Sequence, residues 1–103
     1  MKVFISYPMK GKTEQEIMEE RSEIIQRARE RFSDVEIIDS YMLFKNYSIA
    51  DDEKTSLKYL GEAIKALADA DVAYFGKGWE TARGCRIENL CAIDYGIDVI
   101  EIY

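Results

Sequence analysis

One carboxylate of this sequence falls where the pattern calls for an apolar side chain. Residues 84–95 are expected to form a helix. At roughly 100° per residue, six side chains share one of its faces: Gly84, Cys85, Glu88, Cys91, Ala92 and Tyr95. Glu88 is at the centre of this face, and a carboxylate partly removed from water near a helix start is a candidate catalytic group. The same pattern also fits a structural glutamate paired with an arginine, or a helix that buries its other face.

The composition leaves acid–base and nucleophilic chemistry to a few residue types. The chain has no histidine, and its two cysteines, Cys85 and Cys91, are six residues apart in the same expected helix. That spacing is too long for a disulfide bond, and a C-x-x-C pair is also absent, which argues against a zinc site. We therefore expect no metal and no cofactor, and assign any such chemistry to Asp, Glu, Tyr, Ser, Cys or Lys.

Charge and hydropathy argue against several classes of protein. The net charge is −6, from 20 acidic and 14 basic residues, whereas broad nucleic-acid binding needs a basic face. No apolar run approaches the ~20 residues of a membrane span, and the first apolar run is too short for a signal peptide. We expect one domain over residues 1–103, without nucleic-acid or membrane partners, located in the cytoplasm.

Strand and helix patterns alternate along the chain. Apolar runs predict strands at residues 2–6, 35–38, 71–75 and 98–103. Between them lie a helix that starts at the capping box Thr13–Glu16, a helix that starts at Asp51 or Asp52, and the Glu88 helix, which ends at Gly96. The second helix has an apolar stripe: Leu57, Leu60, Ile64 and Leu67. This alternation predicts an α/β fold, a three-layer, doubly wound, mainly parallel sheet of four to five strands flanked by helices, as in Rossmann-like and flavodoxin-like proteins.

The loops after the first three strands are expected to form a ligand site. Ligands of such folds bind beyond the carboxyl ends of the strands, where loops 7–12, 39–41 and 76–84 should meet. These loops and the helix start behind them carry both basic clusters of the chain: Lys10, Lys12, Lys77, Arg83 and Arg86. The coincidence favours an anionic small molecule, although the second cluster also balances Glu80.

Several residues near these loops have both a functional and a structural interpretation. The segment Gly76–Gly78 lets the backbone approach a phosphate, although it matches neither a Walker loop nor G-x-G-x-x-G. Trp79 either stacks on a base or plugs the loop against the core or a neighbouring subunit. Tyr7 either projects its hydroxyl toward the crevice or is a rim aromatic. By position alone, Asp71 is a cap or turn residue at the opposite end of its strand.

Three stretches of the chain resemble the nucleoside 2-deoxyribosyltransferase-like superfamily, in particular its small phage and bacterial members. The stretches are residues 3–11, 68–75 and 78–92. In that family a glycine four residues before the catalytic glutamate and an alanine four residues after it match Gly84 and Ala92. The resemblance implies that Glu88 is the nucleophile, that Tyr7 positions it, and that Asp71 protonates the leaving base.

The resemblance implies cleavage or transfer of the N-glycosidic bond of a nucleoside or nucleotide, by a 2-deoxyribosyltransferase or a deoxynucleotide N-glycosidase. The implied substrate-binding residues are Lys10, Gly11, Lys77, Gly78, Trp79, Glu80, Arg83 and Gly84. The basic loops favour a 5′-phosphorylated substrate. Two positions depart from the base-exchanging members, which carry an acidic or hydroxyl residue in place of Ala82 and a glycine in place of Leu90.

Other functions are also compatible with the sequence. One is a nucleotide-binding module without catalysis, and another is a structural or interaction protein that uses its aromatic residues for assembly. A fainter resemblance to TIR domains, through residues 4–7 and the spacing of Cys85 and Glu88, suggests a TIR-like NAD glycohydrolase. The small core and the family resemblance predict a homo-oligomer. Tyr41, Phe44 and Tyr47 would form a lid, a subunit contact or a packing segment.

Overall fold

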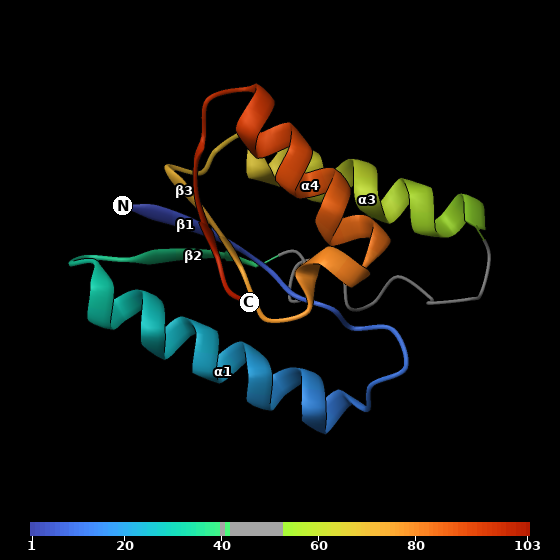
Figure 1. Ribbon diagram of the computed structural model, residues 1–103, viewed down its shortest axis with the longest axis horizontal. Coiled ribbons are helices and arrows are strands. Elements are labelled where there is room, and N and C mark those ends of the chain that lie inside the picture. The colour runs from blue at the N-terminus through green and yellow to red at the C-terminus, as the bar shows by residue number, and fades with distance from the viewer. Residues whose placement is uncertain (40, 42–52) are drawn as a thin grey trace.

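The computed structural model describes residues 1–39, 41 and 53–103, and these form an α/β fold around one all-parallel sheet (Figure 1). The strands are β1 (Lys2–Ser6), β2 (Glu36–Asp39), β3 (Val72–Phe75) and β4 (Asp98–Glu101), in the order β2-β1-β3-β4. The helical elements are α1 (Glu14–Arg31), α3 (Glu53–Leu67), the 3₁₀ turn η1 (Trp79–Thr81) and α4 (Arg83–Asp94). The predicted fold class and its alternation of strands and helices are confirmed. Phe44, Tyr47 and the expected cap at Asp51 or Asp52 lie outside the described residues.

Helices cover both faces of the sheet, which makes three layers (Figure 1). On one face, α1 packs through the four residues Ile17, Ile24, Ile25 and Ala28. On the other, α3 and α4 contribute Ala63, Leu67, Cys85 and Ala92. Successive side chains of a strand point to opposite faces, so β1 directs Val3 and Ile5 toward α1 and Phe4 toward α3 and α4.

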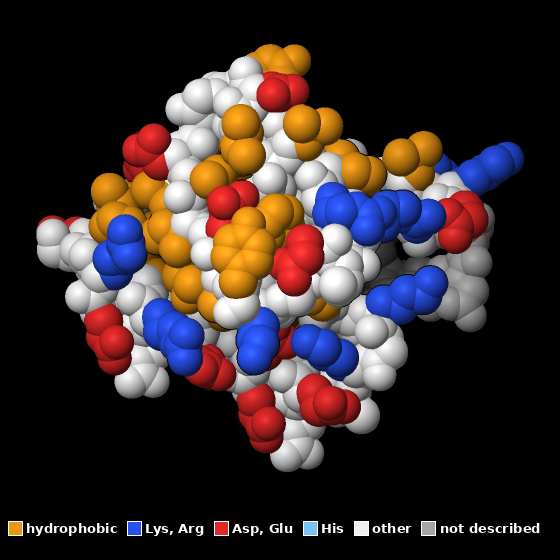
Figure 2. All heavy atoms as spheres, in the orientation of Figure 1, with side chains coloured by type: hydrophobic (Ala, Val, Ile, Leu, Met, Phe, Trp, Pro, Cys, Tyr) orange, Lys and Arg blue, Asp and Glu red, His pale blue; other side chains and the backbone are white. Residues whose placement is uncertain are grey.

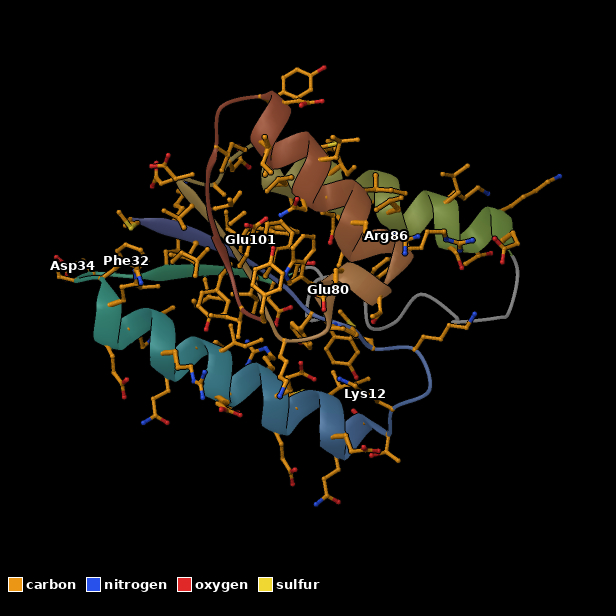
Figure 3. All side chains as sticks on the ribbon, viewed as in Figure 1. Lys12, Phe32, Asp34, Glu80, Arg86 and Glu101 are labelled. Atoms are coloured by element: carbon orange, nitrogen blue, oxygen red, sulfur yellow. The ribbon has the colours of Figure 1, made fainter. Side chains whose placement is uncertain are left out.

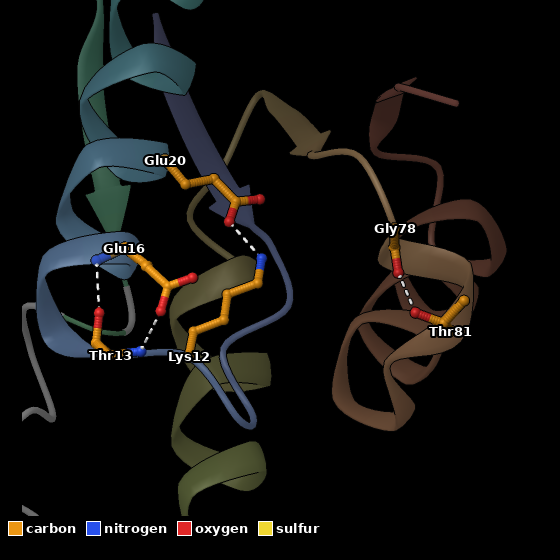
Figure 4. Close-up of polar contacts among 6 residues, drawn as sticks. All are labelled: Lys12, Thr13, Glu16, Glu20, Gly78 and Thr81. Carbon is orange, nitrogen blue, oxygen red and sulfur yellow. Dashed lines mark hydrogen bonds and ion pairs between the residues drawn. The ribbon is translucent and has the colours of Figure 1, made fainter.

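The ends of the helices follow local sequence signals. Thr13 and Glu16 form the predicted capping box, in which the Thr13 hydroxyl accepts a hydrogen bond from the Glu16 amide at 3.1 Å (Figure 4). After α4, Gly96 has a φ of +77°, a conformation that glycine adopts without strain. The expected stripe on α3 is only partly correct, because Leu57 is 67 % exposed.

The strand order places a switch point at β1, which has β2 on one side and β3 on the other. At the carboxyl end, Ser6 pairs with Phe75 and Phe75 pairs with Glu101. At the amino end, the Lys2 amide donates a hydrogen bond to the Asp71 carboxylate at 2.7 Å. The crevice that binds ligands in such folds is therefore expected near Ser6 and not near Asp71. Among the described residues, no helix combines the length and apolar character that crossing a membrane requires.

Candidate active site

Glu88 lies inside the protein, beneath α4 at the carboxyl end of β1. Its side chain is one of four buried on the inner face of the helix, with Cys85, Asn89 and Ala92. Glu88 is 7 % exposed, and its Oε1 accepts a hydrogen bond of 2.7 Å from the hydroxyl of Ser6, which is also buried. Within the described part of the chain, the carboxylate therefore pairs with a neutral hydroxyl and not with an arginine.

Burial controls the ionisation of this site. It raises the pKa of Glu88 from 4.5 to about 7, although the hydrogen bond from Ser6 acts in the opposite direction. Burial likewise raises the pKa of the Cys85 thiol to about 11, with a further contribution from the charge of Glu88. Near neutral pH, Cys85 is thus an unreactive thiol, whereas Glu88 is in the range in which a carboxyl group exchanges protons readily.

The structure does not pair Tyr7 with Glu88. Tyr7 follows Ser6 by one residue and packs in the cluster under α1, on the opposite face of the sheet. Its hydroxyl is buried without a hydrogen-bond partner among the described residues, and burial raises the pKa of Tyr7 well above its ordinary value, as does the neighbouring Asp39. Ser6 takes the position next to Glu88 that the family resemblance assigned to Tyr7.

A second polar cluster lies around Tyr7 on the α1 side of the same sheet edge. Asp39 ends β2, is buried, and forms an ion pair with Arg21 of α1. Its other carboxylate oxygen accepts a hydrogen bond of 3.1 Å from the Tyr41 amide. Sequence reasoning assigned no role to Asp39 and Arg21, although a charged residue directly after a buried apolar run is a recognisable signal.

Asp71 is at the amino ends of the strands, whereas Glu88 is at their carboxyl ends. It precedes β3, while Glu88 contacts Ser6, which pairs with the last residue of β3. Four residue steps at ~3.3 Å place these two ends about 13 Å apart. Asp71 is exposed, and its carboxylate accepts a hydrogen bond from the Lys2 amide, as expected of a turn residue. The role of proton donor to the leaving base, which the family resemblance implies for Asp71, has no geometric support.

The predicted basic loops lie at the carboxyl end of the sheet, but part of their charge is already paired. Lys12 contacts Glu20 at 2.6 Å (Figure 4), and Arg83 contacts Glu53 of α3 at 2.8 Å. Figure 3 shows Lys12 near the start of α1, and Glu80 of η1 and Arg86 of α4 above it in this view.

The remaining predicted binding residues of these loops are largely on the surface. The exposed ones are Lys10, Gly11, Lys77 and Glu80, while Gly84 is half-buried. Gly78 has a φ of +87°, and its carbonyl accepts a hydrogen bond of 2.7 Å from Thr81 (Figure 4). This glycine therefore shapes the turn into η1.

Trp79 is a packing residue. It is 8 % exposed, and its ring lies 5.7 Å from Phe75 and 5.9 Å from Tyr103, measured between ring centroids. Of its two sequence-based interpretations, the structure shows the one in which the indole plugs the loop against the core. Tyr103 is 76 % exposed and is the aromatic ring of this group that a ligand can reach.

A second carboxylate, which sequence reasoning missed, lies on the α4 side of the same edge. The Asn89 amide group donates a hydrogen bond of 2.9 Å to Glu101, the last residue of β4; Glu101 is labelled in Figure 3. Ser6, Phe75 and Glu101 are in register across three strands, so Glu101 is about 10 Å from Ser6 at ~4.8 Å per strand. The signal in the sequence was the parallel sheet itself, which brings the ends of all its strands to one edge.

Two hollows of about 510 and 480 Å³ lie along α1, away from Glu88. The larger is lined by residues of α1, among them Arg21 and Ile25, and by Ile37 of β2. Among the residues that the structure describes, no group of three histidine, cysteine, aspartate or glutamate side chains is arranged to hold a metal ion.

The fold and the site define an α/β protein with a parallel sheet and a buried carboxylate at its switch point. Comparisons with models of protein families, with curated proteins and with solved structures find no match for this chain. A functional assignment therefore depends on the geometry of the site.

Proposed function

We propose that this protein cleaves or transfers the N-glycosidic bond of a nucleoside or nucleotide through Glu88. The observation that carries the proposal is a buried carboxylate at the switch point whose direct partner, among the residues that the structure describes, is a hydroxyl and not a cation. A buried carboxylate without a compensating charge destabilises a fold, and such groups are concentrated at functional sites. Two further observations agree with the proposal. The loops at the carboxyl ends of the strands are basic, and α/β folds with a parallel sheet bind ligands at these ends.

The proposed reaction uses the ionised form of Glu88. The carboxylate attacks the anomeric carbon, the electrons of the carbon–nitrogen bond leave with the base, and the base takes up a proton. Water or a second base then attacks the glycosyl ester and restores the carboxylate. Because the pKa of Glu88 is about 7, we expect the rate to rise with pH and to reach half of its maximum near pH 7.

The proton for the leaving base is better assigned to Glu101 than to Asp71. Glu101 is on the same side and at the same edge of the sheet as Glu88, whereas Asp71 is about 13 Å along the strands from that edge. We expect Glu101→Gln to slow base release and Asp71→Asn to leave it nearly unchanged. The opposite ranking would restore Asp71 as the proton donor.

Substrate is expected to approach Glu88 past the first turn of α4. Glu88 is 7 % exposed, so neighbouring side chains must move before a sugar reaches it. Gly84 is one turn earlier on α4, and a Cβ atom built on it would meet nothing within 4 Å. The helix backbone is therefore accessible at this position, and Gly84→Ala should leave the fold intact while hindering the sugar.

The exposed lysines of the two loops favour a phosphorylated substrate. Lys10 and Lys77 lie on the loops that follow β1 and β3, where a 5′-phosphate would be held by charge-assisted hydrogen bonds. Equal turnover of a deoxynucleoside and its monophosphate would contradict this part of the proposal. We further propose that the protein is cytoplasmic and acts as a homo-oligomer.

The experiment is to incubate the protein with deoxynucleosides, deoxynucleoside monophosphates or NAD and to detect free base by chromatography. We expect base release that Glu88→Gln abolishes and Glu30→Gln retains, since Glu30 is an exposed carboxylate on α1. Release from NAD alone would favour the TIR-like activity. Thermal stabilisation by these compounds without release would favour a nucleotide-binding module, and no response to any of them would refute both.

A further inference from the structure

The outer face of α4 is apolar although it faces solvent. Ile87, Leu90 and Ile93 are 36 %, 59 % and 53 % exposed, and they repeat every three residues along the side of the helix opposite Glu88. Figure 2 shows hydrophobic side chains over α4, with basic side chains toward its start and an acidic one near its end. Contiguous apolar surface of this kind marks an interaction site more often than an unused surface.

The neighbouring helix α3 also carries an exposed apolar side chain. The ion pair between Arg83 and Glu53 joins the start of α4 to the start of α3. Leu57, one turn further along α3, is 67 % exposed. Exposed apolar side chains therefore occur on both helices on this side of the sheet.

The residues of this face are arranged symmetrically about Leu90. Ile87 precedes Leu90 by three residues and Ile93 follows it by three. Arg86 precedes it by four and Asp94 follows it by four, and both side chains are exposed. Among the described residues, Arg86 donates a long hydrogen bond of 3.5 Å to the Glu80 carbonyl of η1 and forms no ion pair. The face is basic at one end, acidic at the other and apolar between them.

We propose that α4 forms the interface of a two-fold symmetric homodimer, in which it packs antiparallel against α4 of a second copy. A two-fold axis through Leu90 places each residue opposite the one equally far on the other side of Leu90. The two Leu90 side chains meet, Ile87 meets Ile93, and Arg86 meets Asp94. The apolar side chains of α4 and both ion pairs thus find their partners in a second copy of the same helix.

The charge pattern selects this partner and this orientation. A parallel arrangement would place Arg86 against Arg86 and Asp94 against Asp94, and like charges in contact oppose association. A different protein would need the same alternation of charge and apolar surface, which a second copy supplies by symmetry. The proposal is independent of the chemistry of Glu88, which is on the opposite side of the helix.

The first test measures the mass of the protein in solution by sedimentation at increasing concentration. We expect the mass to approach twice 11.9 kDa and Leu90→Asp to weaken dimerisation on the order of a hundredfold, since the substitution acts on both copies. Circular dichroism verifies that the variant folds, which is expected because Leu90 is 59 % exposed. A protein that stays monomeric up to concentrations on the order of hundreds of micromolar, or a dimer that Leu90→Asp leaves intact, would overturn the proposal.

The second test exchanges the charges and does not alter the apolar surface. Arg86→Asp alone and Asp94→Arg alone each place like charges opposite one another, so both variants should dimerise poorly. Mixed in equal amounts, they should form a heterodimer, because each new charge then faces an opposite one. Matched controls are Glu23→Arg and Arg27→Asp on α1, an exposed pair away from this face, which should dimerise alone and mixed like the unaltered protein. A mixture that associates no better than its components would refute the antiparallel arrangement.

Discussion

Replacing Glu88 by glutamine should stabilise the protein, and by an amount that depends on pH. Glutamine has nearly the shape of glutamate, and its carbonyl oxygen can accept the hydrogen bond that Ser6 now donates to Oε1 at 2.7 Å. It does not ionise. The difference in unfolding free energy between the two proteins therefore isolates the cost of burying the charge of Glu88.

The magnitude follows from the pKa of Glu88. In the unfolded chain this carboxyl group loses its proton near pH 4.5, whereas in the folded protein it keeps the proton up to about pH 7. Between these values the folded state binds more protons, so the free energy of unfolding falls as pH rises. At ~1.4 kcal/mol per pKa unit, the loss is about 3 kcal/mol. It is absent below pH 4.5 and complete above about pH 8.

The assay is urea unfolding of the protein and of Glu88→Gln at several pH values between 4 and 9. The difference between them should be constant at the acid end and grow by about 3 kcal/mol in favour of the variant, a midpoint shift of about 2 M urea at alkaline pH. Most other groups titrate equally in both proteins and cancel, and the chain has no histidine to complicate this window. Cys85, whose pKa depends in part on the charge of Glu88, has a pKa of about 11 and stays protonated over this range.

Two outcomes would refute this reasoning. A difference that does not change with pH would show that Glu88 is not held in its neutral form by burial. A difference that changes in the opposite direction would mean that a positive charge stabilises the carboxylate in the folded protein. The exposed Glu30→Gln is the matched control and should give a flat difference over the whole range.

Three further substitutions test other contacts of the fold. Ser6→Ala removes a hydrogen bond that lowers the pKa of Glu88. We expect the pKa of Glu88 to move above 7 in this variant, as measured from the pH dependence of the stability difference between Ser6→Ala and the double variant Ser6→Ala/Glu88→Gln. Arg21→Met leaves the buried carboxylate at the end of β2 without its cation and should cost about 3 kcal/mol in urea unfolding, whereas Arg27→Met, in an exposed pair, should cost less than about 1 kcal/mol. Gly76→Ala should lower the thermal midpoint by several degrees, for a cost of about 1–3 kcal/mol. The new Cβ would lie 2.9 Å from the Cδ1 methyl of Ile24 and 3.2 Å from the Cβ atom of Tyr7. An unchanged midpoint in any of these experiments would contradict the contact concerned.

The fold was predictable because each element has a strong local signal. Parallel strands buried on both faces must be nearly continuous apolar runs, and the run 2–6 became β1 without a shift. The run 35–38 became a strand over residues 36–39, one residue later. The capping box located the start of α1, and Gly96 located the end of α4.

The inner face of α4 was predictable from helical periodicity, and this prediction fails where the helix ends. Helical periodicity correctly grouped Cys85, Glu88 and Ala92 as buried. It failed for Tyr95, which is 84 % exposed, because α4 ends at Asp94 and the angle of a residue beyond the helix end is no longer defined by the helix.

The partner of Glu88 was not predictable from these signals. Ser6 and Tyr7 are adjacent at the end of β1, and the pleat sends one side chain toward α4 and the other toward α1. Which of the two faces α4 depends on how the sheet is layered in three dimensions, whereas the family resemblance favoured the tyrosine. The ion pair between Arg21 and Asp39 was missed for the same reason, since its residues belong to different elements and meet only after folding.

The choice of a serine beneath Glu88 bears on how the carboxyl group is used. An arginine at this position would hold the carboxylate in its charged form and remove the stability cost at alkaline pH, but it would also occupy the space next to the oxygen that attacks in the proposed reaction. A hydroxyl orients Oε1 and lowers the pKa only in part, so the group still titrates near pH 7. A buried acid that passes between its protonated and charged forms at neutral pH suits a reaction in which the carboxylate is consumed and regenerated. The same titration should therefore appear in two independent measurements, as a loss of stability and as a gain of activity with rising pH.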